Sequence, residues 1–173
     1  MSESHCNNSG SSQTDDCCGV KIKQEPAPNC LRCNKRGKPV SLVTIKSLLV
    51  SESARHVGSG PYYFCPTFSC PVVYFTKNDE QIFETSDLTV RVAQKDHSAT
   101  TPICYCFHHT RKSIEDEIES TGKSTVIARI TAEVQAGRCE CETKNPQGTC
   151  CLGNVSRVVK DVMRGLNDFA KVE

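Results

Sequence analysis

The chain has 173 residues, of which 37% are hydrophobic, 13 are Cys and none is Trp. Its 21 Lys and Arg residues nearly balance 20 Asp and Glu residues, and the net charge of +1 gives no electrostatic reason to expect binding to nucleic acid or to an anionic membrane. No apolar run approaches the roughly 20 residues that span a bilayer, which argues against membrane insertion. Two small modules fit this length, and modules with thin cores generally need disulfides or metal ions to fold stably.

The N-terminus, MSESHCNNSGSSQTDDCC, lacks the basic region and the apolar run of a signal peptide, so we expect a cytoplasmic protein. In the reducing cytosol, closely spaced cysteines indicate metal sites before disulfides, and an odd number of cysteines also fits a disulfide framework poorly. Residues 1–28 are rich in Ser, Asn, Asp and Gln, a composition typical of a disordered tail. Its thiols have no fixed role in this interpretation; the alternative is capture of a soft metal by Cys6, Cys17 and Cys18.

The first predicted module begins at a pair of cysteines. Cys30 and Cys33 form a CxxC motif, and Gly37 follows where the backbone must fold tightly around a metal, as in a zinc knuckle. Cys65 and Cys70 form a second, wider pair between aromatic and β-branched segments. Four thiolates that leave no position for water are what a structural zinc site requires. We therefore expect zinc, with a redox disulfide or an iron centre as alternatives.

Short strand-like segments surround these cysteines. Residues 38–50, 71–76, 81–87 and 88–94 are rich in apolar and β-branched residues and are separated by Gly, Pro, Asn and Asp. The pattern predicts a small antiparallel sheet anchored on zinc. We place this β module at residues 29–98.

The second predicted module, residues 99–173, is helical. Cys104 and Cys106 lie in a segment that we expect to be extended, so that both sulfurs project to one face. Thr110 then offers an N-cap for a helix that ends at Gly122.

A second helix follows at once. Ser124 is its expected cap and Gly137 its end, and Ile127, Ile130 and Val134 form the stripe that we expect to be buried.

Four more cysteines come after this helical hairpin. The turn residues of Asn145–Gly148 fold the chain back between them, and the final segment, NVSRVVKDVMRGLNDFA, repeats apolar residues with the period of a helix. Either Cys139 or Cys141 can ligate a metal, whereas adjacent Cys150 and Cys151 diverge, so only one of them can easily serve.

Thiols thus occur just before two helix starts. A cluster of two ferric ions, two sulfides and four thiolates has a net charge of about −2, which helix N-termini stabilise. A second zinc is the competing occupant, because four thiolates serve either metal. A Rieske-type centre, in which His108 and His109 replace cysteines, is a further alternative.

Two resemblances extend this interpretation. The CYC motif entering a helix, the helical hairpin and the returning cysteines resemble the bacterioferritin-associated ferredoxin fold, a small 2Fe-2S domain. The motifs CLRCNKRGKPVSLVTIKSLL, YYFCPTFSCPVVYF, LTVRV, ICYCF and NPQGTCCLGN, in that order, resemble the N-terminal domain of CopZ-type copper chaperones, which carries one zinc and one 2Fe-2S cluster. The resemblance implies zinc ligands at Cys30, Cys33, Cys65 and Cys70, and cluster ligands at Cys104, Cys106, Cys141 and Cys151.

The expected fold class is therefore α+β, with a small zinc-anchored antiparallel β module followed by a three-helix 2Fe-2S module. In the full-length chaperones a copper-binding domain with a Met-x-Cys-x-x-Cys loop follows, and this sequence shows none before Glu173. We expect an accessory to metallochaperones that transfers single electrons in copper or other soft-metal handling, with metal-ion reduction as its conceivable activity. Its partners would be a soft-metal chaperone or transporter and an electron donor. The alternatives are a cluster-dependent redox sensor or interaction protein, and a soft-metal sequestering protein that uses the tail.

Overall fold

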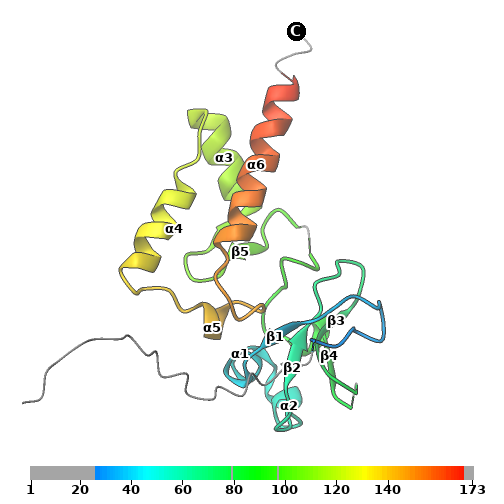
Figure 1. Cartoon of the computed structure of the whole chain (residues 1–173). Coiled ribbons are helices and arrows are strands. Elements are labelled where there is room, and N and C mark those ends of the chain that lie inside the picture. The colour runs from blue at the N-terminus through cyan, green and yellow to red at the C-terminus, as the bar shows by residue number, and fades with distance from the viewer. Residues whose placement is uncertain (1–25, 79, 97, 170–173) are drawn as a thin grey trace, which may run out of the picture.

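The structure, a computed structural model, describes residues 26–78, 80–96 and 98–169. An antiparallel sheet with two short helices forms one end of the described chain, and longer helices form the other (Figure 1). This arrangement confirms the predicted α+β class. None of the described helices combines the length and the apolar character that crossing a membrane requires.

The sheet has four strands, and each pairs with the next one along the chain. The order is β1-β2-β3-β4, and all the pairs are antiparallel. The predictions at residues 71–76 and 81–87 are confirmed, because β3 and β4 lie within them. The strands are β1 at Lys38–Val40, β2 at Tyr62–Phe64, β3 at Val72–Thr76 and β4 at Ile82–Glu84.

The strand predicted over residues 38–50 is wrong beyond Val40. The chain instead forms α1 at Leu42–Leu48, followed by the single turn α2 at Ser51–Ala54. Ser41 caps α1, because its hydroxyl accepts a hydrogen bond of 3.2 Å from the N–H of Thr44. The buried residues Thr44, Ile45 and Leu48 recur with helical spacing, and this pattern prevails over the β propensity of the segment.

The strand predicted over residues 88–94 is also wrong. Leu88 makes a single antiparallel bridge to Leu49, and the N–H of Thr89 donates to the carbonyl of Leu48 over 2.8 Å. The partner of this segment is the extended link at residues 49–50 between α1 and α2, which is too short for a ladder to continue. Residues 88–94 therefore run irregularly, after the 3-10 turn η1 at Thr85–Asp87, toward the helical part.

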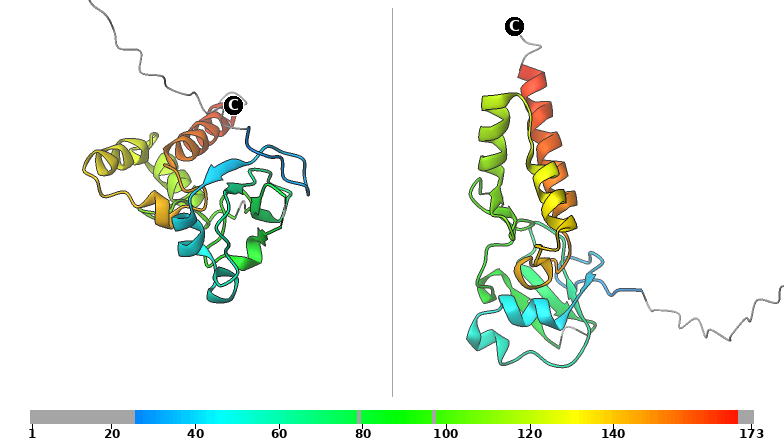
Figure 2. Two further views of the ribbon diagram at one scale, coloured as in Figure 1. Left: turned by 60° about the horizontal axis from the view of Figure 1, so that its bottom comes forward. Right: turned by 90° about the vertical axis from the view of Figure 1, so that its left-hand side faces the viewer.

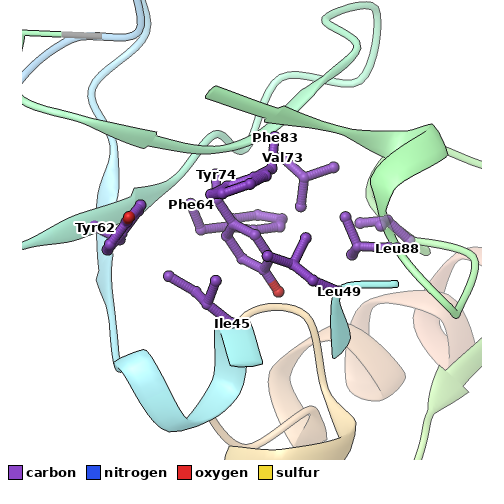
Figure 3. Packing of buried hydrophobic residues seen from close by; sticks show 9 residues of the cluster. Ile45, Leu49, Tyr62, Phe64, Val73, Tyr74, Phe83 and Leu88 are labelled. Atoms are coloured by element: carbon purple, nitrogen blue, oxygen red, sulfur yellow. The ribbon is translucent and has the colours of Figure 1, made fainter. Parts of the chain in front are cut away.

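Strand β3 is buried on both faces. A β-bulge between Val72 and Tyr74 brings the adjacent residues Val73 and Tyr74 into one cluster, while Val72 and Phe75 face another. The first cluster is aromatic and aliphatic and packs against α1 through Ile45 (Figure 3). The second contains three of the cysteines of the first module.

The helical part begins with a short hairpin, β5 at Pro102–Cys104 and β6 at His109–Thr110. Three longer helices follow, as predicted, and α3 and α6 run side by side (Figure 2). A four-residue helix that was not predicted precedes the last one. These helices are α3 at Arg111–Thr121, α4 at Val126–Gln135, α5 at Cys141–Lys144 and α6 at Leu152–Phe169.

The helix ends match the sequence signals closely in α3 and less closely in α4. Thr110 and Ser113 form a reciprocal capping box, and Gly122 ends α3 with a left-handed φ of 73°. In α4 the N-cap is Thr125 and not Ser124. Val134, predicted to be buried, is 38% exposed, because α4 turns Val126 and Ile130 toward the core that α6 completes.

The loop that carries the last cysteines rests on the sheet part. The hydroxyl of Tyr74 donates a buried hydrogen bond of 2.9 Å to the carbonyl of Pro146. Gly148 has a φ of 64°, and a Cβ at this position would lie 2.7 Å from Oγ1 of Thr44 in α1. The hydroxyl of Ser41 also donates to Glu142 over 3.0 Å. The two halves of the molecule are therefore joined through this loop.

We predict that Tyr74→Phe lowers the free energy of unfolding by about 1–3 kcal/mol, because the buried carbonyl of Pro146 loses its donor. Urea denaturation of the zinc-loaded protein measures this change. Tyr63→Phe, on the neighbouring strand with a half-buried ring, is the matched control and should change stability less. Equal stabilities of Tyr74→Phe and the wild type would show that this contact does not hold the loop.

Candidate metal centres

Four cysteine sulfurs of the sheet part converge on one point. The Sγ atoms of Cys30, Cys33, Cys65 and Cys70 all lie within 4.8 Å of one another. The Sγ atoms of Cys30 and Cys70 are 3.9 Å apart, and those of Cys33 and Cys65 are 3.5 Å apart. Tetrahedral zinc with bonds of about 2.3 Å places its sulfurs about 3.8 Å from each other. The four side chains thus already stand at the spacing that zinc needs.

The first cysteine pair sits in a tight turn. The N–H of Cys30 donates to the carbonyl of Lys35 over 2.9 Å, and the N–H of Asn34 donates to the carbonyl of Cys30 over 2.7 Å. The left-handed residue is Asn34, with a φ of 57°, and not Gly37 as the zinc-knuckle pattern suggested. Asn is one of the few residues other than Gly that readily adopts this conformation.

Gly37 serves close packing instead. A Cβ there would lie 2.7 Å from the ring of Phe75 and 2.7 Å from Cβ of Tyr63. Only a residue without a side chain lets the turn approach these two aromatic residues. The glycine was recognised from the sequence, but its physical role is different.

The second pair is fixed by the sheet and by a lysine. The N–H of Cys65 donates to the carbonyl of Val73 over 2.9 Å. The ammonium of Lys95 donates to the carbonyls of Thr67 and Cys70, over 2.7 Å and 3.0 Å. Four thiolates around zinc carry a net charge of −2, so a cation beside this loop is favourable. Sequence reasoning missed Lys95, which lies just beyond the strand predicted over residues 88–94 and belongs to no recognisable motif.

The surroundings shift the pKa values of Cys70 and Cys33 in opposite directions. Burial raises the pKa of Cys70 to about 12, and repulsion from Cys65 adds to the effect. Burial acts in the same direction on Cys33, but hydrogen bonds from the hydroxyl of Thr67 and the N–H of Lys35 outweigh it and lower the pKa to about 7. A bound zinc holds all four as thiolates and displaces their protons, so zinc affinity falls as the pH falls.

A second group of cysteines lies at the start of the helical part. The Sγ atoms of Cys106, Cys139 and Cys141 all lie within 4.8 Å of one another. The Sγ atom of Cys106 is 3.8 Å from that of Cys141 and 3.9 Å from that of Cys139, and the latter two are 3.1 Å apart. The N–H of Glu140 donates to Sγ of Cys106 over 3.3 Å, which favours the thiolate.

Cys104 and Cys151 form an adjoining pair, each only 1% exposed. A hydrogen bond from the thiol of Cys151 lowers the pKa of Cys104 to about 6. The same hydrogen bond, together with burial, raises the pKa of Cys151. The backbone N–H of Cys151 also bonds to the sulfur of Cys141, so the pair and the group of three are in contact. The carbonyl of Cys151 accepts the N–H of Val155 over 3.0 Å, at the start of α6.

The four predicted cluster ligands are thus divided between two adjoining groups. Cys106 and Cys141 lie with Cys139, whereas Cys104 lies with Cys151. Cys104 ends β5 and Cys106 lies in the following turn, so each joins a different group of sulfurs. Cys139 contacts the others, while Cys150 is exposed and outside both groups. Among the described residues no histidine joins either group. The tail cysteines Cys6, Cys17 and Cys18 lie outside the residues that the structure describes.

Tyr105, between the two cysteines of the CYC motif, ties them to the sheet part. Its hydroxyl donates to the carbonyl of Arg91 over 2.8 Å and accepts from the N–H of Ala93 over 2.9 Å. The segment from Arg91 to Lys95 thus contacts the loop of Cys70 at one end and Tyr105 of the CYC motif at the other. Sequence reasoning missed this role, although a tyrosine between two cysteines is a possible signal.

We predict that Cys65→Ser abolishes stoichiometric zinc binding, because one corner of the sulfur tetrahedron is lost. The affinity for zinc should fall by more than the roughly 10–100-fold that the loss of an outer-shell partner costs. Competition with a chromophoric chelator measures it. Cys150→Ser removes an exposed thiol outside both groups and should retain wild-type affinity; an equal loss in both variants would contradict the assignment.

Comparisons with known proteins agree with this geometry. The family model of the CopZ-type zinc binding domain matches residues 27–89. The copper chaperone CopZ of Archaeoglobus fulgidus is 33% identical over 130 residues, which are 75% of this chain and 60% of the relative. The X-ray structure of the N-terminal domain of Archaeoglobus fulgidus CopZ matches with a TM-score of 0.63 and 31% identity, over 75% of this chain and 96% of that domain. The chain therefore belongs to the family of CopZ N-terminal domains.

Proposed function

We propose that this protein holds one structural zinc and one 2Fe-2S cluster and transfers single electrons in the handling of copper or another soft metal. The observation that carries the proposal is the presence of two separate thiol centres. One is a closed set of four sulfurs, and the other gathers buried and half-buried sulfurs at the start of α6. We assign the redox role to the second centre, since a closed set of four thiolates suits a structural metal.

The zinc would be held by Cys30, Cys33, Cys65 and Cys70. Four thiolates leave no position for a substrate or a water molecule, so this metal would support the fold and take no part in electron transfer. It would join the two cysteine-bearing turns to the buried strand β3.

The cluster would be held by Cys104, Cys106, Cys141 and Cys151. Such a cluster takes up and releases one electron when bound. The chain supplies the surroundings: the N–H groups of Glu140 and Cys151 point at the sulfurs of Cys106 and Cys141, and the N-terminal end of α6 adds a positive partial charge. Hydrogen bonds to cluster sulfurs stabilise negative charge and so raise the reduction potential.

We expect electron partners to bind on the half-buried side of this centre. Cys106 and Cys139 are partly exposed, whereas Cys104, Cys141 and Cys151 are buried. A donor or an acceptor would approach from the side of Cys106. Membership in the family of CopZ N-terminal domains supports a copper context, with a copper chaperone or transporter and a reductant as partners in the cytoplasm.

We expect anaerobically purified protein to contain about two iron, two sulfide and one zinc per chain. Dithionite should bleach its visible absorption. The reduced protein should then return one electron to one equivalent of Cu(II), which restores the colour and yields Cu(I) that a chelator traps.

Cys151→Ser and Cys150→Ser form a matched pair of controls at adjacent positions. Cys151→Ser should lose iron and sulfide but keep its zinc, because the sheet part does not depend on this thiol. Cys150→Ser should keep all three. A wild-type protein with two zinc and no sulfide, even after cluster reconstitution, would overturn the proposed function.

A further inference from the structure

A pocket of about 470 Å³ lies next to the hairpin of the CYC motif, and none of its lining residues is a cysteine. Its wall is made by the end of α1, residues 89–91, the β5–β6 hairpin and the end of α5. Of these, α1 and α5 lie against each other (Figure 1). Pockets of about 300–1,000 Å³ are of the size that holds small organic molecules in proteins. The proposed electron transfer makes no use of this space.

The inner wall of the pocket is apolar. Leu48 and Tyr105 are only 4% and 6% exposed, and Pro102 lies half-buried in the same wall. The hydroxyl of Tyr105 is already hydrogen-bonded to the backbone of Arg91 and Ala93, so this ring needs no further polar partner. Such a wall favours a ligand with a flat, apolar body.

Cations stand at the exposed rim. Arg91 comes from the segment after η1 and Lys144 from the end of α5, and none of the described residues that line the pocket is acidic. Each cation already has one carboxylate partner outside the pocket. The guanidinium of Arg91 lies 3.6 Å from Asp96, and the ammonium of Lys144 contacts Glu140.

These two ion pairs leave both cations able to bind a further anion. The side chains of Arg91 and Lys144 are 67% and 45% exposed, and ion pairs in contact with solvent contribute little. A guanidinium also has five N–H donors, of which one carboxylate uses at most two. An anion at the rim can therefore add to these contacts or replace them.

His108 completes the rim and has an unusual backbone conformation. Its φ of 55° lies in the left-handed region, which few residues other than Gly adopt. Residues in such sparsely populated conformations recur at ligand sites. The turn that follows the CYC motif thus also contributes an imidazole to this pocket.

We propose that this pocket binds a small organic anion, a molecule with a flat aromatic body and one carboxylate or phosphate group. The body would pack against Leu48, Pro102 and Tyr105, and the anionic group would accept charge-assisted hydrogen bonds from Arg91 and Lys144. The inference does not rest on the proposed function, because neither copper nor a cluster takes part in the binding.

The test uses the full chain with its metal content as purified. The probe is 2-naphthoate, and the control ligand is 2-naphthamide, which has the same aromatic body and no charge. Ligand-observed NMR titrations measure the dissociation constants. We expect 2-naphthoate to bind with a dissociation constant of about 1 mM or lower, and 2-naphthamide to bind about tenfold more weakly.

Arg91→Gln combined with Lys144→Gln should weaken 2-naphthoate binding about tenfold and leave 2-naphthamide binding unchanged, because only charge-assisted hydrogen bonds are lost. The contact of Tyr105 survives, since it uses the carbonyl of Arg91. Arg36→Gln combined with Lys160→Gln is the matched control. It removes two exposed cations outside the pocket and should change neither affinity. Unchanged zinc content and circular dichroism verify that both double variants fold.

Equal affinities of the two ligands would overturn the assignment of an anion. Equal weakening of 2-naphthoate in both double variants would reveal a general attraction to cations and overturn the site, as would a lack of binding to the wild type. Iron and sulfide are measured on the same samples. Their absence, even after reconstitution, would overturn the proposed function and leave a positive binding result standing.

Discussion

Four sulfurs gathered on one face of β3 need a cation to hold them there. Thiolates at distances of 3.5 Å and 3.9 Å repel one another, and burial raises the pKa values of Cys30 and Cys70, so the set is favourable as thiolates only around a metal ion. The rest of the sheet part depends on this centre. The bulge in β3 turns Val72 and Phe75 toward the cysteines and Tyr74 toward α1, so one strand carries both the metal centre and the aromatic core.

The second centre is built on the first. Its loop packs on α1 through Gly148, and its Pro146 carbonyl is held by Tyr74, a residue of the zinc-anchored sheet. A second route runs through the segment from Arg91 to Lys95. Lys95 donates to the carbonyl of Cys70, and the hydroxyl of Tyr105 in the CYC motif donates to the carbonyl of Arg91. The two groups of sulfurs are therefore linked by a buried contact at Tyr74 and by part-buried contacts at Lys95 and Tyr105.

The sequence predicted those features that follow from local patterns. The capping box at Thr110, the left-handed end at Gly122 and the strand of β3 were all visible as residue types at fixed spacing. The helix α1 was mistaken for a strand, since its β-branched residues carry a β propensity that burial against the sheet overrides. The irregular course of residues 88–94 and the role of Lys95 depend on tertiary partners, which no local pattern contains.

The same distinction applies to the cysteines. Spacing identified the pairs at Cys30 and Cys65, since each pair lies within one turn. It did not determine the relation between Cys139, Cys106 and the pair of Cys104 with Cys151, because this depends on how the loop folds back across the start of α6. A closed set of four thiolates is typical of a structural metal site. A group with half-buried thiols is accessible to a partner and so suits exchange of a metal ion or an electron. The contrast in burial between the two centres thus supports the proposal that the first stabilises the fold and the second exchanges electrons.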